Sequence, residues 1–207
     1  PARDGFRFDD AVADVVDLLE VLHPRRVALV GLSLGGNIAQ EVVRRAPERV
    51  DALVVADATC NTAPRRGLQK AAALTAIRYL AHYPRWLFLH AAERVTAEDP
   101  AARDYVRATT ATMSQRDVVR VLTSLVSTAL RPDPEYRLPV PTLILHGDRD
   151  RVGDIAAGNE RWVRGQPHAE LAVISSASHL SNLDAPEAFN RRLTDFLDRQ
   201  LPARPPD

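Results

Sequence analysis

Three residues of the types used in nucleophilic catalysis each follow an apolar run of this sequence: Ser33, Asp150 and His179. A serine hydroxyl is too weak an acid to attack an ester unaided, so an imidazole must take its proton and later pass it to the leaving group. A carboxylate on the other ring nitrogen fixes the imidazole tautomer and stabilises the imidazolium. If the three runs are parallel strands, their carboxyl ends meet at one sheet edge, where we expect these groups to converge.

The serine stands in a turn between a strand pattern and a helix pattern, within residues 27–40. The pattern G-x-S-x-G in this context is typical of a nucleophile elbow, whose tight turn exposes the serine Oγ. We expect Gly31 and Gly35 to let the strand and helix backbones pass close beside it. The turn would also aim the Leu34 backbone N–H at a developing oxyanion, next to the positive end of the helix. An ordinary strand-to-helix turn is the alternative interpretation.

The elements that must position the serine alternate between helix and strand. The first part of the chain predicts a helix, a strand, a helix and a strand: 9–22, 26–30, 34–45 and 50–56. The first helix is amphipathic, and we expect Asp9 to cap it and Pro24 to stop it. The order strand, helix, strand makes a right-handed parallel unit with Ser33 at the carboxyl edge of the sheet.

A stretch without strand patterns then predicts an inserted helical layer, with breaks near Pro84, Pro100 and Ser114. The chain thereby divides into a first core part, a helical cap, a second core part and a disordered tail: 1–60, 61–135, 136–201 and 202–207. Some apolar cap residues could line a pocket above Ser33, although packing between cap helices is the expected role of each: Leu74, Ile77, Trp86, Phe88, Met113 and Leu122.

The second core part returns to the alternation. It predicts a strand, a helix, a strand and a final helix: 142–145, 154–164, 170–174 and 184–201. A turn of small residues delivers His179 after the last strand. We expect Asp184 and Glu187 to form a capping pair, with Pro186 in the first turn of the final helix.

Of the six histidines, only His179 lies between a predicted strand and a capped helix. We expect His146, at a strand end, to pack in the core. The others are expected to be solvated or to cap helices: His23, His82, His90 and His168.

The composition indicates a single soluble domain with an insertion, since 207 residues with 45% hydrophobic residues can bury one good core. Lys+Arg and Asp+Glu number 27 each, which removes the electrostatic case for nucleic acid or an anionic membrane surface as partner.

Cys60 is the only cysteine, and we expect it to pack in the core without a disulfide or metal site. Lys70 is the only lysine, and the sequence offers no physical explanation for this bias. Without a membrane-spanning segment or signal peptide, we expect a cytoplasmic protein that needs no cofactor.

Three motifs carry a resemblance to the α/β-hydrolase family: GLSLGG at the elbow, HGDRD after the third strand and SHLSNLDAPEAF before the last helix. The likeness covers roughly residues 6–59 and 139–201, and the order Ser, Asp, His is the one found in that family. The final segment is most similar to the enol-lactonase and small-esterase branch. The resemblance implies an α/β fold with a parallel sheet, flanking helices and an inserted cap, although only part of the family's fold is present.

Three carboxylates compete for the acid position. The family spacing H-G-x-x-D selects Asp150 and leaves Asp148 as a turn-capping group. Asp57 is a rival, because some members of the fold place the acid after the preceding strand. The chain also lacks the proline that the family often carries a few residues past the acid, and has Val152 and Gly153 there.

In the family, further strands precede the first helix, and a loop among them supplies the second oxyanion N–H. This chain starts almost directly in that helix. We therefore expect the elbow strand to be an edge strand, despite a composition typical of a strand paired on both sides. The expectation is that the sequence is a fragment, or that a partner chain, as in a homo-oligomer, completes it. We expect the chain as given to lack enzymatic activity, and the same chain extended upstream to have it.

The resemblance implies a serine hydrolase of carboxylic esters or lactones that acts through an acyl-enzyme on Ser33, with a small-molecule substrate. The same triad can serve carbon–carbon bond hydrolysis or cofactor-free peracid formation. Dehalogenase and epoxide hydrolase chemistry are disfavoured, because those relatives carry an aspartate nucleophile. A non-catalytic ligand-binding module or inactive fragment is the alternative of another class, although the three retained groups argue against it.

Overall fold

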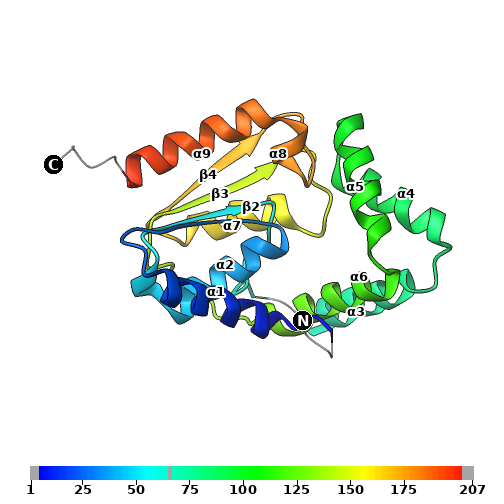
Figure 1. Cartoon of the computed structure of the whole chain (residues 1–207), viewed down its shortest axis with the longest axis horizontal. Coiled ribbons are helices and arrows are strands. Elements are labelled where there is room, and N and C mark those ends of the chain that lie inside the picture. Colours follow the sequence, from blue (N-terminus) through cyan, green and yellow to red (C-terminus); the bar gives the residue numbers. More distant parts are fainter. Residues whose placement is uncertain (1–4, 65–66, 202–207) are drawn as a thin grey trace.

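A parallel sheet forms the centre of the computed structural model, which describes residues 5–64 and 67–201 (Figure 1). Within these residues the strand order is β1-β2-β3-β4, and every neighbouring pair is parallel. The strands are β1 (Ala28–Leu32), β2 (Ala52–Ala56), β3 (Thr142–Gly147) and β4 (Ala169–Ile174). Their carboxyl ends therefore lie at one edge, as the sequence predicts. The strand β1 is at the end of this order, and its Val30 side chain is 48% exposed.

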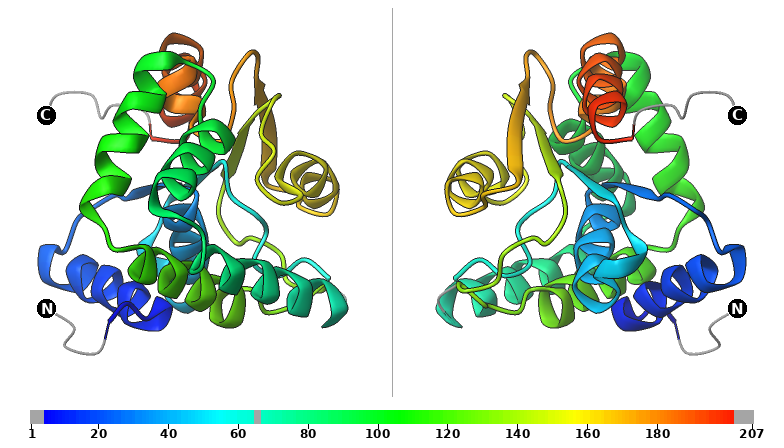
Figure 2. Two further views of the ribbon diagram at one scale, coloured as in Figure 1. Left: turned by 90° about the vertical axis from the view of Figure 1, so that its right-hand side faces the viewer. Right: turned by 90° about the vertical axis from the view of Figure 1, so that its left-hand side faces the viewer.

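Helices cover both faces of the sheet. One apolar cluster joins α1 (Phe8–Leu22), α2 (Leu34–Arg45) and α7 (Ile155–Arg164) to the face that carries Val55 and Ile144. The other face packs Val54 and Leu145 against α9 (Pro186–Gln200). In both views of Figure 2, α7 and α9 lie on opposite sides of β4. Alternate residues of each strand thus enter opposite layers, as the period of two requires.

Between β2 and β3 the chain forms the inserted helices, a name used below for residues 67–129. They comprise α3 (Gly67–Leu80), α4 (Arg85–Thr96), α5 (Pro100–Thr112), α6 (Gln115–Ser124) and the π-helical turn η2 (Leu125–Ala129). Figure 1 shows α3 and α6 side by side, with α4 and α5 standing beyond the sheet edge. The breaks fall at the predicted positions, and the Ser114 side chain caps α6 by accepting from the Asp117 N–H. The division into core and cap domains stays a prediction.

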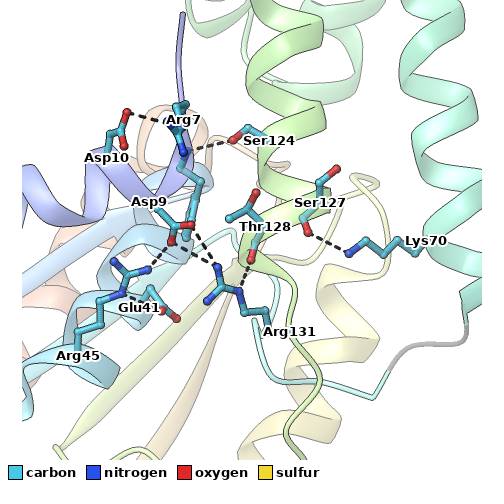
Figure 3. A network of polar contacts seen from close by, with 11 residues as sticks. Arg7, Asp9, Asp10, Glu41, Arg45, Lys70, Ser124, Ser127, Thr128 and Arg131 are labelled. Carbon is cyan, nitrogen blue, oxygen red and sulfur yellow. Dashed lines mark hydrogen bonds and ion pairs between the residues drawn. The ribbon is translucent and has the colours of Figure 1, made fainter. Parts of the chain in front are cut away.

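The first helix starts differently from the prediction. The residue before α1 is Arg7, and no side chain caps the helix. Asp9 lies inside the first turn, where its carboxylate pairs with Arg45 and, at 3.2 Å, with Arg131 (Figure 3). The expected Asp9 cap is wrong, because Arg45 of α2 and Arg131, which follows η2, bind this carboxylate.

The predicted capping pair of the final helix is also wrong. The helix α9 begins at Pro186 without a side-chain cap, since Asp184 closes the preceding short helix α8 (Ser181–Asp184). The Asp184 carboxylate instead accepts N–H groups of Glu98, Asp99 and Ser178, at 2.8–2.9 Å. These loop donors lack a helix or strand partner, which explains why they capture the carboxylate. The predicted disordered tail, 202–207, lies outside the described residues.

No helix among residues 5–64 and 67–201 has the length and apolar character needed to cross a membrane.

Candidate active site

The turn that carries Ser33 is sharp. Ser33 joins β1 to α2 with φ 51° and ψ −118°, a conformation that residues other than glycine rarely adopt. Its N–H donates to the Ala56 carbonyl at 2.8 Å, and its carbonyl accepts the Asn37 N–H at 3.1 Å. Both backbone groups are thus fixed by the neighbouring strand and the following helix. The side chain projects from a rigid support.

Two glycines let the strand and the helix approach at this turn. A Cβ on Gly31 would lie 2.3 Å from the Gly35 carbonyl oxygen, and one on Gly36 would lie 2.8 Å from the Ala58 Cβ. A Cβ on Gly35 would meet nothing within 4 Å. The expected pair, Gly31 and Gly35, is therefore corrected to Gly31 and Gly36. A side chain on Gly35 would extend into open space. The peptide between Gly35 and Gly36 is the part of the helix that packs against Gly31.

The three side chains predicted to converge form one hydrogen-bonded series. The Ser33 Oγ lies 2.8 Å from the His179 Nε2, and the His179 Nδ1 lies 3.0 Å from an Asp150 carboxylate oxygen. These residues follow three different strands, β1, β3 and β4. The Asp150 side chain is fully buried and that of His179 is 8% exposed. A neutral imidazole with its proton on Nδ1 satisfies both contacts, since Nε2 then accepts the serine proton.

The loop after β3 holds Asp150 in place. Its second carboxylate oxygen accepts the Val152 N–H at 2.8 Å, within the segment where the family's proline is absent. A Cβ on Gly147 would lie 2.1 Å from the Ala177 carbonyl oxygen. Only a residue without a side chain lets the loops that carry Asp150 and His179 pack this closely.

Asp57 follows β2, and among the described residues the hydrogen bond to the His179 Nδ1 comes from Asp150 instead. Its buried carboxylate accepts the Gly147 N–H at 3.1 Å, the Ser181 N–H at 3.1 Å and the Ser181 hydroxyl at 2.6 Å. Burial raises the pKa of Asp57 to about 7, while the hydrogen bond from Ser181 opposes the rise. Asp57 therefore ties the end of β3 to the start of α8.

The third candidate acid, Asp148, is exposed to solvent. Among the described residues, Asp150 is the one of the three carboxylates that contacts the His179 ring. No pattern in the sequence indicates the link through Ser181 and Gly147, although these residues lie within the motifs SHLS and HGDRD.

A cavity of about 190 Å³ opens beside Ser33 and His179. Its walls come from the loop after β2, the loop after Asp150, α3 and the η2 region. The inserted helices contribute Gln69, Lys70, Ala73, Leu125 and Val126. None of the apolar residues considered for this role lines the cavity. Phe88 is buried elsewhere and Trp86 is 70% exposed.

The backbone N–H of Leu34 and the buried side-chain amide of Asn37 both lie in the helix that follows Ser33. Leu34 is the first residue of α2, so its N–H has no carbonyl partner within the helix. The Asn37 side chain is 2% exposed and donates to the Thr59 carbonyl and the Asn61 side chain, at 2.9 and 2.6 Å. These bonds attach the loop after β2 to the helix that follows Ser33.

His146 is buried in β3, and burial lowers the pKa of its imidazole. Cys60 belongs to the core cluster of the α1 and α2 face.

A parallel sheet whose edge brings together a serine on a strained turn, a histidine and an aspartate defines an α/β-hydrolase. The chain belongs to the family described as serine aminopeptidase, S33, which matches residues 5–185. It is a hydrolase of the α/β-hydrolase class.

The chain is 30% identical over 203 residues to the pimeloyl-acyl-carrier-protein methyl ester esterase of Chromobacterium violaceum, covering 94% of this chain and 78% of that protein. It is 26% identical over 202 residues to the 3-oxoadipate enol-lactonase 2 of Acinetobacter baylyi, covering 94% and 72%. Among solved structures, a thermophilic esterase from Thermogutta terrifontis superposes with a TM-score of 0.76 at 20% identity, covering 94% and 73%. The last likeness shows the fold alone.

Proposed function

We propose that the native protein hydrolyses carboxylic esters or lactones through an acyl-enzyme on Ser33. The observation that supports this most is the unbroken series from the Ser33 Oγ through His179 to Asp150, which opens into a cavity. Relatives named as an esterase and an enol-lactonase point to the same bond type. Ser33 acts as the nucleophile, His179 as the base and Asp150 as the group that orients the imidazole.

In the first half of the reaction, the His179 Nε2 takes the Ser33 proton as Oγ adds to the substrate carbonyl carbon. Negative charge then develops on the carbonyl oxygen. The Leu34 N–H and the positive end of α2 stabilise that charge. The imidazolium, held by Asp150, donates its proton to the alkoxide oxygen as the carbon–oxygen bond breaks. The alcohol leaves from an ester, and stays attached to the acyl group from a lactone.

In the second half, water attacks the acyl carbon while His179 takes a proton from it. The tetrahedral intermediate expels the serine Oγ, which regains its proton from the imidazolium. The products are a carboxylic acid and the free enzyme, so each proton taken by His179 is returned within the cycle.

Active-site labelling tests this proposal. A fluorophosphonate probe should label the native protein at Ser33, and Ser33→Ala should abolish labelling without changing the circular dichroism spectrum. Undiminished labelling in the folded Ser33→Ala variant, or none in the wild type, would reject the assignment. A panel of aryl esters, lactones and 1,3-diketones then separates ester hydrolysis from carbon–carbon bond hydrolysis, and tight binding without turnover would indicate a binding module.

A further inference from the structure

We propose that the cavity beside Ser33 selects substrates that carry a second, negatively charged group, and that the Lys70 ammonium binds this group. The inference rests on the proposed function, because it names the substrate class of the same site. Lys70 is the single lysine in a chain whose other basic side chains are arginines. This one lysine lies in the wall of the cavity that contains Ser33.

Lys70 lies in the first turns of α3 and lines the same cavity as Ser33 and His179. Lys70 is partly buried as a residue, and the hydrogen bond that its ammonium makes is exposed to solvent. Figure 3 shows its side chain extending from α3 toward Ser127, whose carbonyl accepts from the Lys70 Nζ at 3.0 Å. The inserted helix thus holds a cation at the wall of the site that contains the reactive serine.

The charge of Lys70 is not matched by this partner. A backbone carbonyl is neutral, and an ammonium has three N–H donors, so one contact leaves donors and charge for a ligand. In the neighbouring network, by contrast, Arg45 and Arg131 share the Asp9 carboxylate (Figure 3). The Lys70 ammonium can therefore bind an anion in the cavity, whereas the charges of Arg45 and Arg131 are paired with Asp9.

The rest of the cavity favours the same assignment. Asp57 is the carboxylate among its lining residues, and it is already bound by Ser181 and the Gly147 N–H. Apolar side chains such as Leu125 and Ile155 form much of the remaining wall. A carboxylate on the substrate would find Lys70 as its partner.

Two matched ester pairs test the inference. Mono-4-nitrophenyl glutarate and 4-nitrophenyl pentanoate place or omit a carboxylate on the acyl side, and 4-acetoxybenzoate and phenyl acetate do so on the leaving side. The measured quantity is the ratio of kcat/KM for the charged ester to that for the neutral ester. Comparing this ratio between variants cancels the intrinsic reactivity of each ester.

We expect Lys70→Met to lower the ratio by about tenfold in at least one pair, the size of effect that a hydrogen bond to a charged group supports. Lys70→Arg should retain most of the ratio. Lys70→Gln, which can still donate to the Ser127 carbonyl, should lose it and serves if Lys70→Met fails to fold. Arg116→Met, which removes an exposed positive charge from α6, is the control and should leave the ratio unchanged.

A purely structural contact between α3 and η2 would give a different result. Lys70→Met would then slow the charged and neutral esters equally, and unchanged ratios in both pairs would overturn the inference. Hydrolysis of the neutral esters, abolished by Ser33→Ala, tests the proposed function separately. If the neutral esters are hydrolysed but the ratios do not respond to Lys70, the proposed function stands and the inference fails.

Discussion

The central strands β2 and β3 and the inserted helices α3 and α6 differ in how far their side chains are buried. Every residue of β2 and β3 is buried, whereas no side chain of α3 or α6 is buried among the described residues. Asp150 follows the fully buried strand β3, Ser33 and His179 follow the partly buried strands β1 and β4, and the cavity wall includes residues of the exposed helix α3. We infer that substitutions at the sheet edge change the reaction rate most, and that substitutions in the inserted helices change which substrates are accepted.

The two regions also differ in the partners of their buried carboxylates, which are uncharged donors at the sheet edge and an arginine in the inserted helices. At the sheet edge, Asp57 joins the end of β3 to the start of α8 through three hydrogen bonds in a buried setting. In the inserted helices, Glu93 of α4 binds Arg107 of α5 and His90. The Leu180 N–H donates to the Thr96 carbonyl at 2.8 Å and connects the two regions.

The largest effect is expected at Asp150. Asp150→Asn should lower kcat by about 10⁴, the size known for the corresponding change in a well-studied triad, because the imidazole loses the carboxylate that fixes its tautomer. Ester hydrolysis and the thermal midpoint are the measurements, and the midpoint should change little. The matched control, Asp148→Asn, alters an exposed carboxylate and should stay within a few-fold of wild type. An equal loss in both variants would show that Asp150 has no special role.

Asp57 should make the folded state sensitive to pH. Burial raises its pKa to about 7, from 3.8 in the unfolded chain, so the native state binds more protons between these values. Stability should therefore fall as the pH rises through this window, by about 2 to 3 kcal/mol between pH 5 and pH 8. Urea unfolding at both pH values measures the drop. Asp57→Asn should remove most of it, and an identical pH dependence in the variant would contradict the account.

Glu93 should control the local stability of the α4 and α5 pair. Its side chain is 3% exposed and is bound by Arg107, which lowers the pKa of the Glu93 carboxyl group. Glu93→Gln should raise amide hydrogen exchange in α4 and α5 about tenfold, because an ionic hydrogen bond is lost. Exchange in β2 and β3 should be unchanged. Uniform acceleration throughout the protein would mean that the two regions unfold together.

The smallest effect is expected at Asp9, which lies at the surface. Its side chain is 40% exposed and pairs with Arg45 and Arg131. Asp9→Asn should cost about 1 kcal/mol or less, and the loss should shrink at high salt. Asp10→Asn, where the ion pair with Arg7 is longer at 3.9 Å, is the control and should cost less. Chemical denaturation at low and high salt distinguishes these outcomes.

Much of the fold could be predicted from local patterns. The bounds of α2, Leu34–Arg45, follow from the glycine turn before it and Pro47 after it, and the structure has the same bounds. The sequence pattern predicts the first strand two residues early, at 26, because an apolar run does not reveal where strand pairing begins. In the structure, the β1 ladder starts at Ala28 opposite Ala52.

Contacts between distant residues were harder to predict. Ser181 binds Asp57, which is 124 residues earlier in the chain, and Asp184 binds N–H groups from the α4 to α5 connection. Such contacts leave no periodic signal in the sequence. Apolar residues of the inserted helices, such as Trp86, likewise carry no sign of which side faces the serine. The convergence of Ser33, Asp150 and His179 was predictable because parallel strands end at a common edge.

Direct detection of the acyl-enzyme tests the central claim. The native protein would be mixed with 4-nitrophenyl acetate, quenched in acid within the first turnover, digested and mapped by mass spectrometry. We predict one acetyl group on the peptide that contains Ser33, and none in Ser33→Ala. An acetyl group on another residue, or hydrolysis at an enzymic rate in Ser33→Ala, would contradict the assignment of Ser33 as the nucleophile.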